Sequence, residues 1–492
     1  MITPGNTFTI AELAAELDGV YLSIEGGDIE LPYASSNSEN VKDGLFVAIA
    51  GSRFDGHDFI DKAFQNGARA VLLSNPERLG TKPGIIVPDT RKAYSALSAL
   101  YYGNPSKECK VIGVTGTNGK TTTTSIIYEF LKNFSYLPLR IGTLGAEAQG
   151  IISRGRGLTT PDPMELQALI REAVNGGANA CVMEVSSHAL DQARVNDIQF
   201  DVAVFTNLTH EHLDYHGNME RYFDAKRSFF HLLAEKSGSS GVAVVNADCR
   251  YGKKIVNEIR SLKLCDYSFG RTEGCSWQIV NFEQDMNGSA IALNFNNREF
   301  TLKTNLIGRY NAENLVAAVA ACHGIGCNLD KLIAAAENVP QVPGRLQAIE
   351  GAPGVFIDYC HTPDGFQVVL STLRELTAGE LWIIFGCGGD RDSSKRAPMG
   401  NIAGQLADRV VLTLDNPRSE DPEQIIKDIT SDGLKPEFVD LDRGRAIKKV
   451  LEAKCDDDIV LIAGKGNEDY QDIKGVKYPY SDLEEVKKFY GL

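Results

Sequence analysis

One glycine-rich segment of the chain has the residues needed to hold a nucleotide phosphate. It reads Thr115-Gly116-Thr117-Asn118-Gly119-Lys120-Thr121-Thr122 and follows the apolar run 111–114. In such a loop, backbone N–H groups can cradle phosphate oxygens at a helix N-terminus, a lysine can reach the β- and γ-phosphates, and a threonine hydroxyl can bind Mg²⁺. Because the strict pattern has glycine where Val114 stands, we interpret the segment as a variant P-loop. The alternative is an ordinary glycine-rich turn.

Two further segments could complete a metal and phosphate site. Glu184 ends a predicted strand, and His212 follows another within 206–214. A carboxylate and an imidazole beside a P-loop can bind Mg²⁺ or orient phosphate, although each could equally be a solvated loop residue. Lys226 lies in a helix predicted over 221–233, where the residue type alone favours a solvated lysine.

Two segments in the last third of the chain place arginines directly after predicted strands. They are 386–392, which contains Arg391, and Asp415-Asn416-Pro417-Arg418. The planar guanidinium group pairs well with carboxylates, so these segments could bind an acidic ligand. Structural turns with surface ion pairs are the alternative.

The elements that must position these residues alternate between strands and helices. Thr9 and Glu12 have the spacing of a helix capping box, with a stop at Gly19. Apolar runs that predict strands lie at 45–49, 70–73, 85–87, 111–114, 180–183, 202–205, 242–245, 355–357, 381–385, 410–412 and 459–462, and one of the intervening helices is predicted over 93–102. Such alternation favours mainly parallel sheets, whose ligands bind at the carboxyl ends of the strands.

The fold class predicted is α/β with three domains. We expect a small α/β domain over 1–106, a central P-loop ATPase-like domain with a mostly parallel sheet over 107–340, and a Rossmann-like domain over 341–492. The breaks are predicted at 103–106 and 339–344, and a chain of 492 residues suits about three domains.

Composition excludes several classes of protein. The net charge of −15 argues against a nucleic-acid partner, which would need a basic face. The ten cysteines contain no CxxC pair, which favours reduced thiols in the cytoplasm. Neither a signal peptide nor a membrane-spanning run is expected.

Together these segments resemble the Mur ligases, and the resemblance runs through nearly the whole chain. Besides the P-loop, it rests on 158–161, 184–188 and 192–194, on Gly308–Asn314, on Pro343-Gly344-Arg345 and on Asp358–Asp364. Asp415–Arg418 resembles the motif by which the diaminopimelate-adding members recognise their amino acid. The resemblance therefore implies an ATP-dependent, amide-bond-forming ligase of peptidoglycan synthesis, acting in the cytoplasm. It would join meso-diaminopimelate to UDP-MurNAc-L-Ala-D-Glu with ATP and Mg²⁺ as cofactors, and we expect a monomer.

The resemblance also implies roles for individual residues. The catalytic residues would be Lys120, Glu184, His212 and Lys226, with Lys226 carbamylated and the metal held by Thr121, Glu184, His212 and Lys226. ATP would contact Gly116, Thr117, Asn118, Gly119, Lys120, Thr121, Thr122, Asn311, Asn314 and Arg345. The UDP-linked substrate would contact Ser36, Ser38, Ser52, Arg53, Phe54, Thr159, Thr160, Ser186, Gln192, Arg194 and His361. The amino acid would contact Arg391, Asp415, Asn416, Pro417, Arg418, Gly464 and Glu468.

Departures from the family pattern leave alternatives open. Asn37-Ser38-Glu39 stands where Asp-Ser-Arg is usual, and Asn467 replaces a histidine. The alternatives are a lysine-adding ligase, a folylpolyglutamate synthase, an ATP-binding regulatory module and a catalytically decayed relative.

Overall fold

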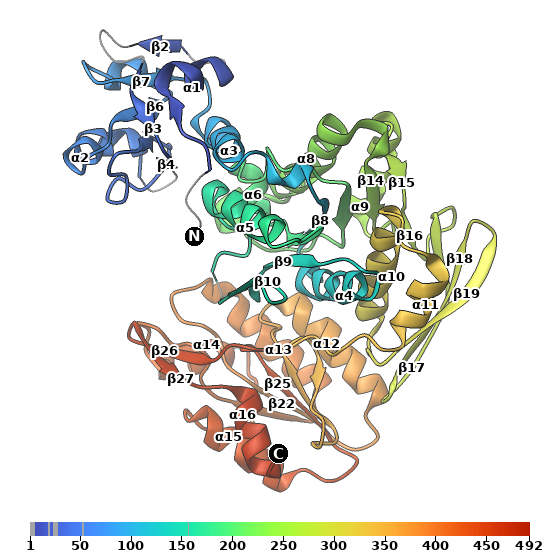
Figure 1. Ribbon diagram of the computed structural model, residues 1–492. Coiled ribbons are helices and arrows are strands. Elements are labelled where there is room, and N and C mark those ends of the chain that lie inside the picture. The colour runs from blue at the N-terminus through green and yellow to red at the C-terminus, as the bar shows by residue number, and fades with distance from the viewer. Residues whose placement is uncertain (1–4, 18–19, 23–27, 52–53, 156) are drawn as a thin grey trace. The chain divides into compact units, whose positions relative to one another are not determined.

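The computed structural model describes residues 5–17, 20–22, 28–51, 54–155 and 157–492 (Figure 1). The chain divides into two compact units, Met1–Gln278 with Val316–Leu332, and Ile279–Leu315 with Ile333–Leu492. Three predominantly parallel sheets lie in the three predicted segments of the sequence. The predicted α/β class is therefore confirmed.

The first sheet has the strand order β2-β7-β6-β5-β4. Strands β4 (Ala34–Ser35), β5 (Leu45–Val47), β6 (Ala70–Leu73) and β7 (Gly84–Ile86) are parallel, whereas β2 (Val20–Leu22) runs antiparallel to β7. Helix α1 (Ile10–Glu16) begins with the predicted capping box between Thr9 and Glu12. Its expected stop, Gly19, lies outside the described residues. Helix α3 (Thr90–Tyr101) packs against α5 (Pro163–Asn175), and the segment at 103–106 continues into a short 3₁₀ helix, Pro105–Lys107.

The central sheet has the order β11-β10-β9-β12-β8-β13-β14-β15. Its parallel strands are β9 (Pro138–Gly142), β12 (Ala180–Glu184), β8 (Lys110–Thr115), β13 (Val202–Phe205), β14 (Val242–Val245) and β15 (Cys265–Asp266). The sequence did not indicate β9, nor the antiparallel strands β10 (Gly145–Ala148) and β11 (Ile152–Arg154). The chain order reverses on either side of β8, which is where an open α/β sheet binds its ligands.

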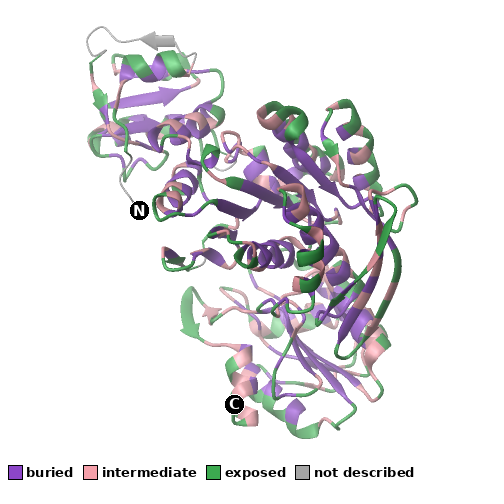
Figure 2. Cartoon of the chain, turned by 45° about the vertical axis from the view of Figure 1, so that its right-hand side comes forward, coloured by how far each residue is buried: buried purple, intermediate pink, exposed green. Residues whose placement is uncertain are grey.

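Helices cover the central sheet because its strands are apolar on both faces. Four residues of β13 and four of β14 are buried, and Figure 2 shows the strands of the sheet in purple. Helix α4 (Lys120–Asn133) follows β8 and packs on β9 and β12, and α8 (Met219–Ser237) packs on β13. A Cβ atom at Gly113 would lie only 2.5 Å from Phe229 of α8, so glycine permits this close approach.

The third sheet has the order β20-β21-β25-β22-β23-β24. Strands β21 (Val355–Asp358), β25 (Ile459–Ala463), β22 (Leu381–Phe385), β23 (Arg409–Leu412) and β24 (Phe438–Val439) are parallel, and β20 (Gln347–Ala348) is antiparallel to β21. Helices α12 (Pro363–Leu376), α13 (Arg396–Leu406), α14 (Pro422–Ile429), α15 (Arg443–Ala453) and α16 (Asp482–Tyr490) accompany it. Because the four longer parallel strands share one direction, their carboxyl ends gather the predicted ligand-binding segments at one edge.

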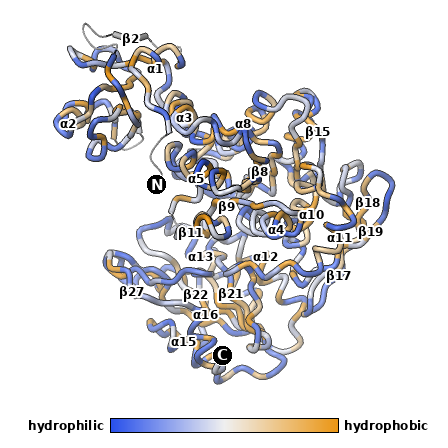
Figure 3. The backbone as a smooth tube through the Cα atoms, viewed as in Figure 1, coloured by the Kyte–Doolittle hydropathy of each residue, from blue (hydrophilic) through white to orange (hydrophobic). Residues whose placement is uncertain are grey.

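Two antiparallel hairpins were not predicted. One joins β18 (Gly288–Phe295) to β19 (Arg298–Thr304), and the other joins β26 (Tyr470–Ile473) to β27 (Val476–Pro479). Figure 3 shows the β27 region as hydrophilic, in contrast to the apolar strands of the sheets. In the described part of the chain, no helix is both long and apolar enough to span a bilayer.

Candidate active site

The predicted P-loop lies between a buried strand and a helix. Strand β8 ends at Thr115, and α4 begins at Lys120. The backbone angle φ is +87° at Gly119, a left-handed conformation that favours glycine. At Gly116, a Cβ atom would lie 1.9 Å from Oγ1 of Thr206, so only glycine lets the loop pass that side chain. The loop therefore requires glycine at both positions.

The lysine of the loop curls back over the loop itself. Lys120 Nζ donates to the carbonyl oxygens of Gly116 (2.9 Å) and Thr117 (2.8 Å). On the other side, Asn118 N donates to Oδ1 of Asn207 at 2.9 Å, and Thr206 Oγ1 donates to Asn118 O at 2.6 Å. Thr206 and Asn207 directly follow β13, so the neighbouring strand braces the loop. Their position after a strand was the available signal for these two residues, which sequence reasoning missed.

Glu184 is brought to the same place by β12, which pairs with β8. It is 1% exposed, and its Oε1 accepts from Thr121 Oγ1 at 3.0 Å and from Thr143 N at 2.9 Å. Thr143 Oγ1 reaches Oε2 at 3.2 Å. A buried carboxylate needs such donors because it has lost its hydration. Thr143 is another residue that the sequence did not single out, since β9, the strand it directly follows, was not predicted.

Lys226 is buried, which makes the solvated-helix interpretation of it wrong. It is 1% exposed, and its Nζ donates to Gly116 O at 2.8 Å and lies 4.9 Å from the centre of the Tyr222 ring. Burial, together with the nearby positive charge of Lys120, lowers the pKa of Lys226 well below its usual range, whereas Glu211 acts in the opposite direction. Lys226 can therefore carry a neutral amine, which is a nucleophile.

His212 lies at the start of α7 (Leu213–His216), near His188, with ring centroids 5.0 Å apart. Burial lowers the pKa of His212 to about 4, so the imidazole is neutral near pH 7 and can act as a ligand. No three His, Cys, Asp or Glu side chains within the described ranges converge as a metal-binding group. The oxygen donors of Glu184 and Thr121 nevertheless suit Mg²⁺, which keeps several waters and phosphate oxygens as ligands.

A second cluster in the first unit contains four of the predicted substrate-binding residues. Arg194 donates from Nη1 to Thr160 O (2.8 Å) and from Nη2 to Gln192 Oε1 (2.7 Å). Thr160 Oγ1 accepts from Ser186 N at 3.0 Å and donates to Glu184 O at 2.9 Å. The cluster is thus tied to the end of β12. Thr159 is also near, because its hydroxyl lies 3.3 Å from that of Thr143.

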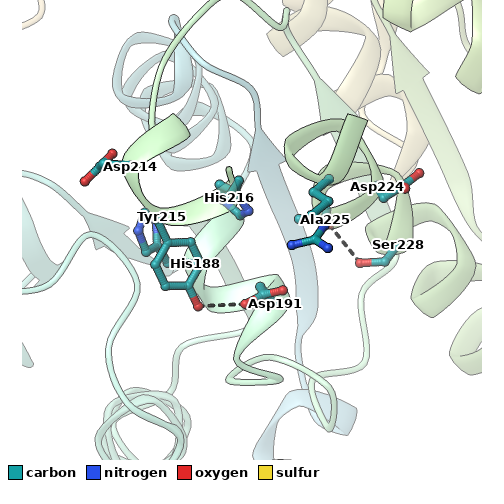
Figure 4. A pocket seen from close by; sticks show the side chains of 9 residues that line it. His188, Asp191, Asp214, Tyr215, His216, Asp224, Ala225 and Ser228 are labelled. Carbon is teal, nitrogen blue, oxygen red and sulfur yellow. Dashed lines mark hydrogen bonds between the residues drawn. The ribbon is translucent and has the colours of Figure 1, made fainter. Parts of the chain in front are cut away.

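A polar cavity of about 820 Å³ adjoins this cluster (Figure 4). It is lined by His188, Asp191, Asp214, Tyr215, His216, Arg221, Asp224, Ala225 and Ser228. Figure 4 shows the bond from Tyr215 OH to Asp191 Oδ2, which is 2.6 Å long. Tyr215 OH also accepts from Gln192 Nε2 at 3.1 Å, which joins the cavity to the Arg194 cluster.

The N-terminal candidates are only partly described. Ser38 is buried and Phe54 is 72% exposed. Ser52 and Arg53 lie outside the described residues. Asn37 Oδ1 accepts from Glu39 N at 2.9 Å, and Lys62 Nζ pairs with Glu39 Oε1 at 2.7 Å. The two residues that depart from the family pattern therefore have local structural partners.

The second unit contains Asn311, Asn314 and Arg345, which were predicted for ATP, and His361, which was predicted for the UDP-linked substrate; Asn311 and Asn314 are buried. Asn311 Nδ2 donates to Ile307 O at 2.8 Å, and Asn314 Nδ2 lies 3.4 Å from Asn311 Oδ1. The Arg345 guanidinium lies 4.3 Å from the centre of the Tyr359 ring, and His361 Nδ1 is 3.0 Å from Tyr359 O.

The predicted amino-acid site also lies in the second unit, at the ends of β22, β23 and β25. Asn416 Nδ2 donates to Glu468 Oε2 at 2.8 Å. Arg418 Nη1 donates to Gly389 O at 2.6 Å, in the loop that contains Arg391. A Cβ at Gly388 would lie 3.0 Å from Arg418 Nη1 and 3.8 Å from Arg391 Cγ, so both arginines flank this glycine.

Arg418 has an uncommon backbone conformation for a residue with a side chain, with φ of +50°. Its N–H donates to Asp472 O at 3.0 Å, and its carbonyl accepts from Lys474 N at 2.7 Å. The unpredicted hairpin β26–β27 therefore holds Arg418 in place. Non-glycine residues in this region often belong to functional sites.

Buried charges lie beneath the same loops. Asp415 is 8% exposed, and burial raises its pKa, with Lys465 and Arg443 opposing the rise. Pro417 is close-packed, since a Cβ at Gly389 would lie 2.0 Å from Pro417 O. Asp415 is close-packed as well, since a Cβ at Gly464 would lie 2.8 Å from Asp415 Oδ2. The structure thus brings together all seven residues predicted for the amino acid, and adds Lys465.

The fold and the sites define a multidomain α/β protein with a P-loop. Three sequence families match it in order: "Mur ligase family, catalytic domain" over 37–102, "Mur ligase middle domain" over 114–322 and "Mur ligase, glutamate ligase domain" over 344–466. The chain belongs to the Mur ligase family.

Individual relatives agree with this assignment. The chain is 43% identical over 462 residues to the UDP-N-acetylmuramoyl-L-alanyl-D-glutamate–2,6-diaminopimelate ligase of Aquifex aeolicus, covering 92% of each chain. It is 40% identical to the enzyme of the same name from Neisseria meningitidis serogroup B, covering 92% of this chain and 93% of the relative. A solved structure of a ligase with this name superimposes with a TM-score of 0.72 at 30% identity and covers 99% of both chains.

Proposed function

We propose that this protein is the ATP-dependent ligase that adds meso-diaminopimelate to UDP-MurNAc-L-Ala-D-Glu during peptidoglycan synthesis. The observation that carries the proposal is the cluster at 415–418, where Asn416 is bonded to Glu468 and two arginines flank Gly388. Such a site offers guanidinium groups for a carboxylate and a carboxylate for an ammonium group. Curated relatives at 37–43% identity carry the name of this activity.

The reaction requires activation of a carboxylate. A carboxylate oxygen of the D-glutamyl residue attacks the γ-phosphorus of ATP, and ADP leaves, so that an acyl phosphate forms. The amine of diaminopimelate then attacks the acyl carbon, and the tetrahedral intermediate expels inorganic phosphate as the amide forms and the nitrogen loses a proton. Catalysis of this kind rests mainly on positioning and on neutralising negative charge.

The P-loop supplies the phosphate side of this chemistry. Lys120 would leave the carbonyls of Gly116 and Thr117 to contact the β- and γ-phosphates, and the backbone of 116–122 would cradle them. Thr121, Glu184 and His212 would hold Mg²⁺, which neutralises phosphate charge when bound. In the second unit, Asn311, Asn314 and Arg345 are the residues proposed for the nucleotide.

Lys226 is proposed to become carbamylated. Its neutral amine attacks the carbon of CO₂, and loss of one proton leaves a carbamate with a negative charge. This carboxylate would add a ligand for a second Mg²⁺. The support is the burial of Lys226 and the effect of that burial on its pKa.

We assign the UDP-linked substrate to Thr159, Thr160, Ser186, Gln192 and Arg194. The last four are joined by hydrogen bonds beside the buried Glu184, and Thr159 is bonded to Thr143. The other residues proposed for this substrate are Ser36, Ser38, Ser52, Arg53, Phe54 and His361. ATP and a UDP-linked precursor are cytoplasmic metabolites, so we place the protein in the cytoplasm. We also expect it to act as a monomer.

The decisive experiment measures phosphate release from ATP with Mg²⁺ and UDP-MurNAc-L-Ala-D-Glu, comparing meso-diaminopimelate with L-lysine. We expect release with diaminopimelate only, and a tripeptide product by mass spectrometry. Preference for lysine would make the protein a lysine-adding ligase, while release with neither amino acid would favour a regulatory module or a decayed enzyme. In the same assay, Arg418→Ala should reduce kcat/KM for diaminopimelate about 100-fold.

A further inference from the structure

A fully buried lysine lies at the centre of the amino-acid site. The Lys465 side chain is 0% exposed. Its Nζ donates to Glu468 Oε2 at 3.1 Å and to Asn416 Oδ1 at 3.2 Å, and lies 3.8 Å from Asp415 Oδ1. The ring centre of Tyr470 is 5.6 Å away. A buried ammonium group must be paired in this way, because burial removes its hydration.

These contacts fix the orientation of the Asn416 side chain. Its Oδ1 receives hydrogen bonds from Lys465 Nζ and from Asp472 N at 2.9 Å, both of which can only donate. Its Nδ2 must therefore face Glu468, to which it donates at 2.8 Å. The amide cannot flip without placing its NH₂ group against two donors.

As a result, the Oε2 oxygen of the Glu468 carboxylate is occupied by two donors. Lys465 and Asn416 both donate to Oε2. The Glu468 side chain is 16% exposed, so it reaches the surface of the site. Lys465 contacts two acidic side chains, Asp415 and Glu468. With both carboxylates ionised, these three side chains carry a net charge of −1, which one ligand cation would balance.

We propose that Lys465 is the positioning residue that sets amino-acid specificity, by holding Glu468 Oε2 so that Oε1 faces the distal ammonium group of the incoming amino acid. This inference rests on the proposed function and adds a residue to it. Lys465 does not touch the reacting atoms. It determines which oxygen of Glu468 meets the ligand.

The test compares two amino acids that differ only at the distal centre. meso-Diaminopimelate has the distal ammonium group, whereas L-2-aminopimelate keeps both carboxylates and the attacking amine but lacks it. In the wild-type enzyme, kcat/KM should favour diaminopimelate strongly. In Lys465→Met this preference should fall about 10- to 100-fold, mainly through KM for diaminopimelate, with KM for ATP unchanged. Lys477→Met is the matched control, since Lys477 contacts the same Tyr470 ring from the exposed strand β27.

If Lys465 had a purely structural role, its substitution would lower kcat/KM for both amino acids by the same factor. If Lys465→Met lowers activity but leaves the preference ratio at the wild-type value, the proposal is wrong. If that variant does not fold by circular dichroism, Glu468→Gln provides the second test. In this variant the amide oxygen of Gln should face the two donors, Lys465 and Asn416, and its NH₂ group should face the ligand. The kcat/KM for diaminopimelate should therefore fall about tenfold more than the kcat/KM for 2-aminopimelate. Equal losses would overturn the proposal. A wild-type enzyme that ligates neither compound refutes the proposed function instead.

Discussion

Lys226 Nζ donates a 2.8 Å hydrogen bond to the carbonyl oxygen of Gly116, the first glycine of the P-loop. A buried amine on α8 is thus held against the loop proposed to bind phosphate. The positive charge of Lys120 acts on it as well and helps to lower the pKa of Lys226. The neutral amine is the form that reacts with CO₂. Burial of Lys226 and the charge of Lys120 both favour this form.

The first prediction concerns Lys226. Lys226→Ala should reduce kcat by roughly 100-fold or more, because the proposed carbamate no longer helps to neutralise phosphate charge. Millimolar acetate should restore part of the activity by supplying a carboxylate to the vacated space. Lys236→Ala is the control on the same helix, since Lys236 pairs with Asp197. Full activity of Lys226→Ala in CO₂-free buffer would refute a role for the carbamate.

Lys120→Ala tests the P-loop. Turnover should fall below detection, because the loop loses the cation that would neutralise the β- and γ-phosphates. Folding should be preserved, since the contacts of Lys120 are with two carbonyls of its own loop. Phosphate release and circular dichroism measure the two effects. Lys132→Ala, at an ion pair with Glu129 farther along α4, should retain activity. A wild-type turnover rate for Lys120→Ala would contradict the P-loop assignment.

Arg443 and Asp482 form a buried ion pair whose two side chains are both 0% exposed. Arg443 Nη2 also donates to Ala463 O, and Nη1 to Leu414 O, directly before Gly464 and Asp415. Arg443→Met should lower the free energy of unfolding by about 3–5 kcal/mol, because Asp482 is left buried without its cation. Urea denaturation followed by fluorescence measures this loss.

The matched control for Arg443 is Arg445→Met. Arg445 is 60% exposed, and Lys449 still pairs with its partner Asp440. The cost should therefore be at most about 1 kcal/mol. Equal losses for the two variants would show that burial does not govern the Arg443 pair.

The lowered pKa of His216 should make the free energy of unfolding depend on pH. Its Nε2 lies 3.0 Å from Ser187 Oγ. Burial first, and then His188, lower its pKa, with Lys226 acting in the same direction and Asp191 and Asp214 opposing. A proton therefore binds more tightly to this histidine in the unfolded chain, whose pKa is about 6.5. The contribution of His216 is complete above that pH and is lost as the pH falls through the lower folded pKa.

The measurement compares the wild-type chain with His216→Gln, which can keep the bond to Ser187. The free energy of unfolding of the variant should decline less steeply from pH 7 to pH 5. His231→Gln, at an exposed histidine of α8, is the matched substitution. Parallel pH profiles for wild type and His216→Gln would contradict the assignment.

Much of the fold could be predicted because apolar runs identify buried strands without reference to distant residues. β6, β13, β14 and β22 begin and end where their runs do. The hairpins and β9–β11 could not be predicted in this way. They are partly exposed or antiparallel, and their pairing depends on the sheet beside them. The division of the chain into three domains at 106 and 340 stays a prediction.

The sequence by itself indicated which residues could carry chemistry and which predicted strand each one ends or follows. The glycine-rich loop, Glu184 and Asp415–Arg418 stand out by residue type and order alone. Only the tertiary structure decided their environment. It buries Lys226 against Gly116, brings Thr143 to Glu184 and Asn207 to the loop, and places Lys465 between Asn416 and Glu468. Burial, pKa and hydrogen-bond direction depend on atoms far apart in the chain, so no local pattern of residues can specify them.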